Sequence, residues 1–430
     1  MKNQPRLAVF FVALCTLFFL ASPNLKGLAK LEGLSTKLLN PQIEKLYRIA
    51  QQPSRVILGL MSGTSLDGLD MALCRFTGQG LSTNCELLHF DSVSFDESFK
   101  TSIRAVFAQE NIHFPSLSTL NVQIARTHAA IILKTLQAWG IRPDEVDIIA
   151  SHGQTVMHRP DRSGKLPHST LQIGDGDHLA HLTGIITLSD FRQKHIAAGG
   201  EGAPIAMFGD YFLFTQAGEE RILLNIGGIG NFTYLPANQD PKAILVTDTG
   251  PGNTLMDAWV RTHYPEKFFD EDAQIARSGK INTDFLTALL GLPFFKESFP
   301  KSTGPEYFNL ERIEKLAPAY ITPADFLATL TRFTAESIAL TIQHYTGLHQ
   351  AHIYVSGGGA RNPLMMEHLK NLMPGFTIQD SAVLGIESAA KEAVLFALLA
   401  NETLMDPTPG AARRLGDSPW MTMGKISLPN

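Results

Sequence analysis

The chain has few cysteines and no excess of positive charge. Only three of its 430 residues are cysteine (Cys15, Cys74 and Cys85), and they are too few and too scattered for a disulfide framework or a zinc site. We therefore expect reduced thiols. The 36 lysines and arginines face 41 aspartates and glutamates, so the composition does not favour nucleic-acid binding. A hydrophobic content of 44% and this length are typical of a globular protein with two or three domains.

A long apolar run occurs near the N-terminus, at Leu7–Leu20. It is short for a membrane-spanning helix, which needs roughly 20 apolar residues. Residues 1–22 have the pattern of a signal peptide, and any membrane contact would come through residues 7–20 if they are retained. The alternative is an N-terminal extension, genuine or from a misplaced start, without bearing on catalysis. Residues 23–54 are expected to be a linker or appended helix, with helical periodicity at Ile43–Ala50.

From Arg55 onward, strands alternate with helices, which indicates an α/β fold. Leu58–Asp70 predicts a strand, a tight turn and a second strand. Its two glycines let the backbone bend closely around a ligand, and its N–H groups and hydroxyls suit a phosphate. Asp67 would then hold Mg²⁺ directly or through water. An ordinary Ser/Gly/Asp hairpin is the alternative.

The pattern restarts after about residue 210. Arg221–Tyr234 is again strand, glycine-rich turn and strand, and Asp248–Thr254 follows a further strand. Asp248 can hold Mg²⁺ through water, and the start of the next helix favours phosphate. Two such hairpins suggest a duplicated fold that clamps phosphates between an N-terminal domain at 55–215 and a C-terminal domain at 216–430.

A third glycine-rich turn, Gly357–Gly359, lies between a predicted strand at Ala351–Val355 and a helix at Leu364–Met373. Three bare glycines would let an adenine ring pack on the backbone. Alone, the turn could equally be a loose loop.

Polar residues that could bind a sugar follow the predicted strand Val146–Ala150, in Ser151–Pro160. Open α/β sheets bind ligands at the carboxyl ends of their strands. His152 and Gln154 could bind a hydroxyl or amide, and Arg159 a carboxylate. The alternative is a polar loop that bonds only its own backbone.

Asp190 follows the predicted strand Ile185–Leu188 and precedes the glycine-rich loop Ala197–Pro204. A carboxylate beside such a loop suits a general base, although a lone Asp there is often a helix cap. Arg192 could bind an acidic substrate group or pair with Asp190.

Other charged and polar residues were expected to face solvent. These are Asn121, Arg126 and His128 on a helix at Leu117–Trp139, and Glu387, Lys391 and Glu392 on a helix at Ile386–Leu399. The alternative for the first three is that they reach a cleft. Lys301–Gly304 is a further candidate for anion or substrate contact.

The order of these motifs resembles the duplicated α/β fold of actin, the heat-shock ATPases and the sugar kinases, with two domains and a nucleotide cleft between them. The full set is similar to one family, the anhydro-N-acetylmuramic acid kinases. The matching segments are 61–70, 151–156, 171–175, 190–192, 197–204, 225–231, 248–253, 301–304 and 356–359.

This resemblance implies that ATP, water and 1,6-anhydro-N-acetylmuramic acid give ADP and N-acetylmuramic acid 6-phosphate, in cell-wall recycling. Asp190 would be the general base, ATP and Mg²⁺ the cofactors, and an amino sugar the partner; a homodimer and a cytoplasmic catalytic domain would fit. Asp67 and Asp248 would hold the metal. The substrate contacts would be His152, Gln154, Arg159, Arg192, Gly200 and Lys301. The nucleotide contacts would be Gly63, Thr64, Ser65, Leu66, Asp67, Gly68, Leu69, Asp70, Gly227, Gly228, Asp248, Gly250, Gly252, Asn253, Gly357, Gly358 and Gly359.

The sequence departs from the family pattern at four positions. The family usually has Asp for His195, Gln for Glu201, Arg for Pro305 and an acidic residue for Arg332. The first two flank the proposed sugar site, so they bear on substrate contacts more than on ATP. They leave open a related kinase with a different amino sugar, and the apolar N-terminus leaves open a weakly catalytic ATP- or sugar-binding module at a membrane.

Overall fold

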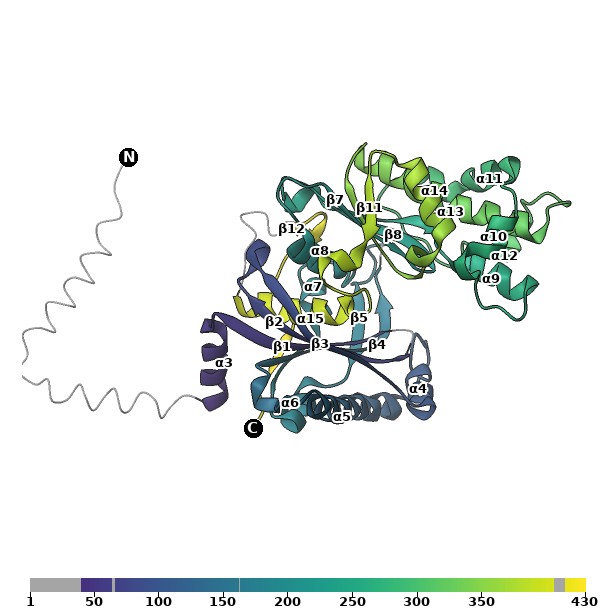
Figure 1. Cartoon of the computed structure of the whole chain (residues 1–430). Helices are drawn as coiled ribbons and strands as arrows, with labels where there is room; N and C mark the ends of the chain where they lie inside the picture. Colours follow the sequence, from purple (N-terminus) through teal and green to yellow (C-terminus); the bar gives the residue numbers. More distant parts are fainter. Residues whose placement is uncertain (1–39, 64–65, 162, 406–413) are drawn as a thin grey trace, which may run out of the picture. The chain divides into compact units, whose positions relative to one another are not determined.

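The computed structural model describes residues 40–63, 66–161, 163–405 and 414–430, and they fall into two units (Figure 1). The first unit ends at Gln51 and includes α3 (Pro41–Gln51), which confirms the helix expected at Ile43–Ala50. The signal-like segment 1–22 lies outside the described residues. Within the described ranges, no helix combines the length and apolar character needed to cross a membrane.

The second unit, Gln52–Asn430, contains two mixed sheets and a small two-stranded one. The strands of the first sheet are β1 (Ser54–Ser62), β2 (Gly68–Thr77), β3 (Asn84–Ser94), β4 (Ile148–Arg159), β5 (Ser169–Ile173), β6 (Ile186–Ser189) and β14 (Lys425–Ser427). Those of the second sheet are β7 (Arg221–Ile226), β8 (Ile229–Leu235), β9 (Leu245–Pro251), β10 (His352–Ser356) and β11 (Thr377–Asp380). The small sheet pairs β12 (Arg414–Leu415) with β13 (Ser418–Pro419).

The two large sheets repeat one topology. In the first, β1, β2 and β3 form an antiparallel meander, β4 runs parallel to β1, and β6 runs parallel to β4. In the second, β7, β8 and β9 form the same meander, β10 runs parallel to β7, and β11 runs parallel to β10. This repeat confirms the predicted duplication, and each half opens on the hairpin that the sequence indicated.

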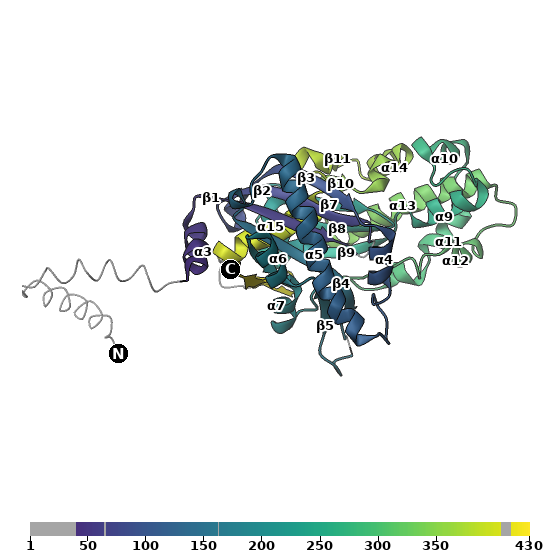
Figure 2. The ribbon, with the colours of Figure 1, turned by 90° about the horizontal axis from the view of Figure 1, so that it is seen from below.

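Helices cover both faces of the first sheet. Figure 2 looks onto α4 (Glu97–Arg104), α5 (Phe114–Trp139) and α6 (Gly176–Thr183), and α15 (Lys391–Met405) packs on β1, β2 and β4 from the other face. Alternate apolar residues of β1, including Leu58 and Leu60, meet Ile132 and Leu136 of α5 in a buried cluster. This alternation is what a strand with one face on a helix requires.

The second sheet packs against a larger apolar cluster centred on α13 (Pro323–Thr346). As predicted, Thr322 caps this helix, because its hydroxyl accepts a hydrogen bond from the Asp325 N–H at 3.1 Å. The remaining helices are α7 (Phe191–Ala197), α8 (Ala206–Phe214), α9 (Thr254–His263), α10 (Gln274–Ser278), α11 (Thr283–Leu290), α12 (Leu310–Glu314) and α14 (Pro363–Leu372).

The last part of the chain returns to the first sheet. Helix α15 covers it, and β14 pairs antiparallel with β6, with Lys425 opposite Ser189. Residues 391–427 therefore pack with the N-terminal sheet, although we expected the C-terminal domain to include all of residues 216–430. The physical reason is that β6 would otherwise be an open edge strand.

Two further expectations differ from the structure. The strand predicted at Val146–Ala150 extends as β4 to Arg159, because residues 154–159 pair with β5, so the alternative of a polar loop is not observed. His128 is only 1% exposed and stacks on Phe95, with ring centroids 5.9 Å apart, so the expectation that it faces solvent was wrong. Asn121 is half-buried and accepts a hydrogen bond from the Gly174 N–H at 2.8 Å.

Candidate active site

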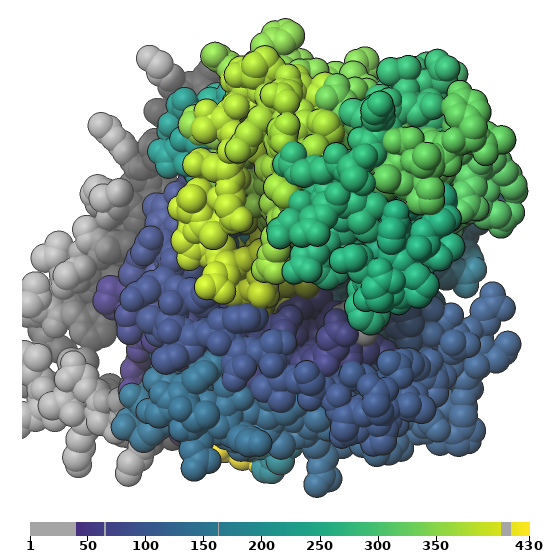
Figure 3. Space-filling view, turned by 45° about the vertical axis from the view of Figure 1, so that its right-hand side comes forward, coloured from purple at the N-terminus to yellow at the C-terminus, as the bar shows by residue number. Residues whose placement is uncertain are grey.

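A cleft of about 2010 Å³ lies between elements of the first and second sheets. Figure 3 shows the blue residues of the N-terminal half below the green and yellow-green residues of the C-terminal half. The predicted contacts Gly200, Asp248 and Lys301 line it. His158 of β4 also lines it, whereas Arg159, the next residue on the strand, is exposed outside this lining. Because neighbouring strand residues point to opposite faces, His158 is the better placed of the two.

Gln154 of β4 supports the first hairpin through two hydrogen bonds. Its amide oxygen accepts a hydrogen bond from the Ser62 hydroxyl at 2.5 Å, and its amide nitrogen donates to the Gly63 carbonyl at 3.3 Å. Gln154 is fully buried, so these contacts make it a support for the turn. Leu66 is buried with a positive φ of 60°, and its N–H closes the turn on the Gly63 carbonyl. Thr64 and Ser65 lie outside the described residues.

The rest of the hairpin differs in exposure along its length. Asp67 is exposed, Gly68 and Leu69 begin β2, and Asp70 is half-buried. Desolvation together with the neighbouring Asp70 raises the pKa of Glu392, a residue that lines the cleft. Two carboxylates, Asp70 of the hairpin and Glu392 of α15, therefore lie near each other.

His152 and Arg192 act as a pair. The Arg192 Nε–H donates to His152 Nε2 at 3.0 Å, while His152 Nδ1 lies 3.0 Å from the Gly153 carbonyl. Burial and the adjacent Arg192 charge lower the pKa of His152 to about 3, so its ring is neutral at pH 7. Arg192 also donates to the Gly202 carbonyl at 2.8 Å. These contacts hold the glycine-rich loop.

Asp190 lies between β6 and α7 in the left-handed backbone region, with φ 55° and ψ 51°. Its side chain makes no capping hydrogen bond to α7, so the helix-cap alternative is not observed. The carboxylate instead contacts the ammonium group of Lys425 on β14 and does not pair with Arg192. Asp190 lies outside the lining of the cleft, five residues before His195 and ten before Gly200, which both line it.

The departure at His195 preserves the form of the glycine-rich loop. His195 Nδ1 accepts a hydrogen bond from the Gly202 N–H at 2.9 Å, and Nε2 lies 2.6 Å from the Ser418 hydroxyl. Burial, with a contribution from Arg192, lowers the pKa of His195. Because an Asp carboxylate can also accept an N–H hydrogen bond, His195 can replace the usual Asp in this contact.

The glycine-rich segments of the second half converge at the ends of β7, β9 and β10. The Gly252 and Asn253 N–H groups donate to the carbonyls of Gly228 and Gly227, both at 2.8 Å. Gly357 has a φ of 85°, and a Cβ there would lie 2.6 Å from the Ile226 carbonyl oxygen. The structure therefore brings together these predicted nucleotide contacts: Gly227, Gly228, Gly250, Gly252, Asn253, Gly357, Gly358 and Gly359.

Asp248 is the carboxylate best suited to a metal. It lines the cleft, and its Oδ2 accepts a hydrogen bond from the Thr303 N–H at 2.8 Å. Burial raises its pKa. A cation would stabilise this desolvated charge, so the residue fits Mg²⁺. Within the described ranges, no three His, Cys, Asp or Glu side chains form a metal cluster.

Lys301 serves the site mainly through its backbone. Its carbonyl accepts a hydrogen bond from the Asp248 N–H at 3.0 Å. Its ammonium donates to the Phe294 carbonyl at 3.1 Å and lies over the rings of Phe294 and Phe299, 4.4 and 4.5 Å from their centroids. Burial lowers the pKa of Lys301. These contacts support a structural role for the side chain.

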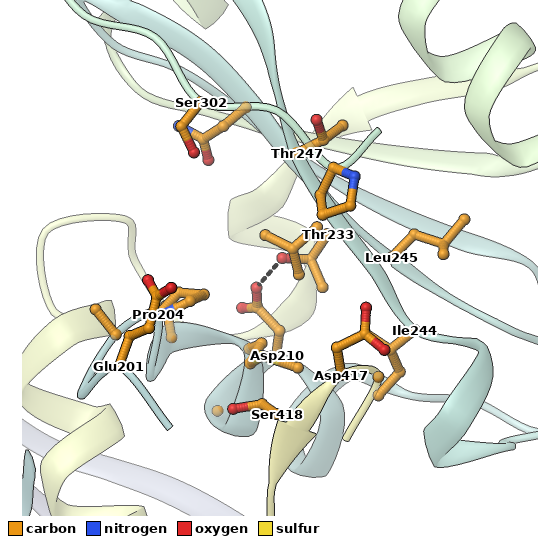
Figure 4. Close-up of a pocket in the computed structure, with 18 of the residues that line it drawn as sticks. Glu201, Pro204, Asp210, Thr233, Ile244, Leu245, Thr247, Ser302, Asp417 and Ser418 are labelled. Atoms are coloured by element: carbon orange, nitrogen blue, oxygen red, sulfur yellow. Dashed lines mark hydrogen bonds between the residues drawn. The ribbon is translucent and has the colours of Figure 1, made fainter. Parts of the chain in front are cut away.

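Two charged residues at the start of α15 were expected to face solvent and instead line the cleft. Lys391 pairs with Asp210 of α8 at 2.7 Å, and Asp210 also accepts a hydrogen bond from the Thr233 hydroxyl at 2.7 Å (Figure 4). Figure 4 shows Asp210 between Glu201 and Asp417, with Thr247 and Ser302 across the pocket. Charges clustered at one end of an otherwise apolar helix were the sequence signal for this contact.

The chain is similar to known proteins that share one name. A family model described as anhydro-N-acetylmuramic acid kinase matches residues 55–427. A protein of that name from Pseudoalteromonas atlantica is 47% identical over 401 residues, covering 91% of this chain and all of that protein. Another from Caldanaerobacter subterraneus subsp. tengcongensis is 36% identical over 396 residues, covering 90% and 100%. A solved ROK family glucokinase from Streptomyces griseus matches with 13% identity and a TM-score of 0.34, covering 80% of this chain and 98% of that one, which is too low to support a structural argument.

The match extends across both sheets and to β14. The repeated topology agrees with the duplicated α/β fold that the order of the motifs predicts. The chain belongs to the anhydro-N-acetylmuramic acid kinase family.

Proposed function

We propose that this protein uses ATP and water to open the 1,6-anhydro ring of 1,6-anhydro-N-acetylmuramic acid and to phosphorylate O6. The products are N-acetylmuramic acid 6-phosphate and ADP. Family membership over residues 55–427 supports the reaction. The structural observation that carries it is Asp190, a carboxylate free of helix capping next to a glycine-rich loop that Arg192 and His195 hold in place.

In the proposed reaction Asp190 accepts a proton from water, whose oxygen attacks the anomeric carbon. The C1–O6 bond breaks, and O6 attacks the γ-phosphorus of ATP, releasing ADP. The leaving oxygen therefore becomes the nucleophile of the second step, and its developing charge passes to the phosphoryl group. Positioning and charge stabilisation dominate phosphoryl transfer, so the two halves must hold sugar and nucleotide together.

The nucleotide is assigned to the three glycine-rich segments. The first hairpin and the turn at Gly227–Gly228 would hold the phosphates, and Gly357–Gly359 the adenosine. Asp248 would hold Mg²⁺, with Asp67 of the first hairpin as a second candidate; the ion would neutralise phosphate charge. Consumption of ATP supports a cytoplasmic catalytic domain. A homodimer is part of the same proposal and rests on family resemblance alone.

A related kinase with a different amino sugar is the second candidate, and Glu201 in place of the usual Gln favours it. Glu201 lines the cleft beside Gly200. A carboxylate there would repel an acidic sugar more than an amide would.

A coupled ADP-release assay tests the proposal. With MgATP and 1,6-anhydro-N-acetylmuramic acid we expect ADP release and a product that has gained one phosphoryl group and one water, measured by mass spectrometry. N-Acetylmuramic acid and N-acetylglucosamine serve as comparison sugars. A product that gains the phosphoryl group alone would contradict ring opening, and turnover only on another amino sugar would favour the second candidate.

A further inference from the structure

The C-terminal strand β14 places a lysine against the proposed general base. Lys425 contacts Asp190 Oδ2, although the two residues are 235 positions apart in the chain. Among the described residues, no other charged group pairs with this carboxylate. The Lys425 side chain is 64% exposed and that of Asp190 23%.

The backbone that carries Lys425 is fixed on both sides. Lys425 pairs with Ser189, the residue before Asp190, in the antiparallel β14–β6 register. Two residues earlier, the Met423 N–H and carbonyl both bond the Thr403 hydroxyl of α15, at 3.0 and 2.6 Å. Strand pairing and these two bonds give the lysine a defined place beside the base.

Gly424 lets the strand approach this closely. It has a φ of 96°, and a Cβ there would lie 3.3 Å from the Phe191 ring and 3.5 Å from the Ser189 carbonyl oxygen. A side chain at this position would be strained and tightly packed against the residues that flank Asp190. The close approach is thus built into the backbone.

Exposed ion pairs contribute little to stability, so removal of the Lys425 ammonium group should change the free energy of unfolding little. A carboxylate has two oxygens. Lys425 occupies Oδ2, and the structure gives Oδ1 no hydrogen-bond partner among the described residues. Because Asp190 is not anchored by helix capping, Lys425 is the contact that fixes its rotamer and leaves Oδ1 for water.

We propose that Lys425 is a positioning residue that orients Asp190 for proton abstraction, so that the C-terminal strand forms part of the catalytic centre. The inference rests on the proposed function, since it needs Asp190 to be the base. It predicts a loss in the chemical step and not in the binding of either substrate.

The test compares the full-length protein with Lys425→Gln and Lys425→Arg. We expect Lys425→Gln to lower kcat roughly tenfold or more, with KM for ATP and for the anhydro sugar unchanged. Lys425→Arg keeps the charge and should recover most of the rate. Lys194→Gln is the matched control, because Lys194 is an exposed lysine on the helix that begins after Asp190. It should leave kcat unchanged.

Thermal unfolding is measured for every variant. A wild-type kcat in Lys425→Gln overturns the inference. An equal loss of kcat in Lys425→Gln and Lys425→Arg, together with a lowered Tm in both, also overturns it, because it shows a structural role. Lys425→Met retains the aliphatic stem and provides a second variant if Lys425→Gln does not fold. A wild-type protein without turnover on the anhydro sugar overturns the proposed function and the inference with it, whereas an active wild type with an unaffected Lys425→Gln overturns the inference alone.

Discussion

The two halves of the molecule share one strand order but carry different chemistry. The first sheet ends in ionisable groups, with His152 on β4, Asp190 after β6 and Lys425 on β14. The second ends in glycine-rich backbone at Gly227–Gly228 and Gly357–Gly359, with Asp248 as its main carboxylate. In the proposed reaction, the duplicated framework would place the ligands, and the additions to one copy would decide which half performs the acid–base step.

Those additions are visible in the first sheet alone. It gains β5, which extends the pairing of β4, and β14, which covers the edge of β6. The second sheet has five strands and neither addition. The proposed sugar chemistry therefore lies where the two sheets differ, and the proposed nucleotide binding lies where they agree.

The sharpest way to separate the halves is Asp190→Asn. We expect kcat to fall by about 10³-fold, since the amide cannot accept the proton from water. Nucleotide affinity, measured by calorimetry, should not change, because the glycine-rich turns of the second half are intact. Turnover near the wild-type rate would remove Asp190 from the role of base.

Gly357→Ala should damage the second half. The alanine would be held at a φ of 85° with its Cβ 2.6 Å from a backbone oxygen, so we expect a loss of about 3 kcal/mol or more in the free energy of unfolding. Nucleotide affinity should fall as well. Urea denaturation and calorimetry measure the two effects.

The matched control for that variant is Gly347→Ala. Gly347 ends α13 with a φ of 69°, and a Cβ there would meet no atom within 4 Å. It measures the cost of a left-handed α backbone, about 1 kcal/mol, whereas Gly357, with a ψ of 173°, lies in a region that essentially only glycine occupies. Equal losses in the two variants would show that packing against Ile226 is unimportant.

Asp67→Asn and Asp248→Asn compare the two candidate metal ligands. Asp248 lies in the cleft and burial raises its pKa, whereas Asp67 is exposed. We therefore expect Asp248→Asn to raise the Mg²⁺ concentration for half-maximal rate by about tenfold and Asp67→Asn to raise it less. The measurement is a Mg²⁺ titration at fixed ATP, and the reverse order would assign the metal to the first hairpin.

The last comparison concerns acid stability, which should depend on the first half. Burial lowers the pKa of His128 to about 4, far below its ordinary value of 6.5. Between these values the unfolded chain binds a proton that the folded chain does not. Stability should therefore fall as pH drops from 6.5 to 4, by at most about 1.4 kcal/mol per pH unit.

His128→Leu should reduce the slope of the free energy of unfolding against pH, measured by urea denaturation. The part of the slope that comes from His152, whose pKa burial lowers to about 3, should remain. His349→Gln is the control, because His349 is exposed. A slope that His128→Leu leaves unchanged would show that His128 is protonated in the folded protein.

The sequence predicted what depends on neighbours along the chain. An apolar run followed by Ser, Gly and Asp located the hairpin at Leu58–Asp70, and the same signals located Arg221–Tyr234. These patterns were sufficient because glycine-rich turns and alternating strands are encoded within a few residues. The repeat of one topology then followed from their order.

What could not be predicted depends on partners distant in sequence. The sequence predicts that Lys391 and His128 face solvent. In the structure Lys391 pairs with Asp210 of α8, and His128 stacks on Phe95, which follows β3. The length of the strand that follows Val146–Ala150 depends on its pairing with β5. Nothing near Lys425 in the sequence points to Asp190. These wrong predictions have one cause. Periodicity shows which face of a helix or strand is apolar, but it does not show which distant residues pack against the polar face.

The pairing of β14 with β6 also sets an order in time. The ribosome synthesises all the remaining strands of both large sheets before Lys425–Ser427. A growing chain can therefore form its glycine-rich turns before Lys425 is available to contact Asp190. If Lys425 orients the base as proposed, nascent chains that already bind nucleotide would remain silent towards the sugar. Activity would then begin only when synthesis has reached the final strand.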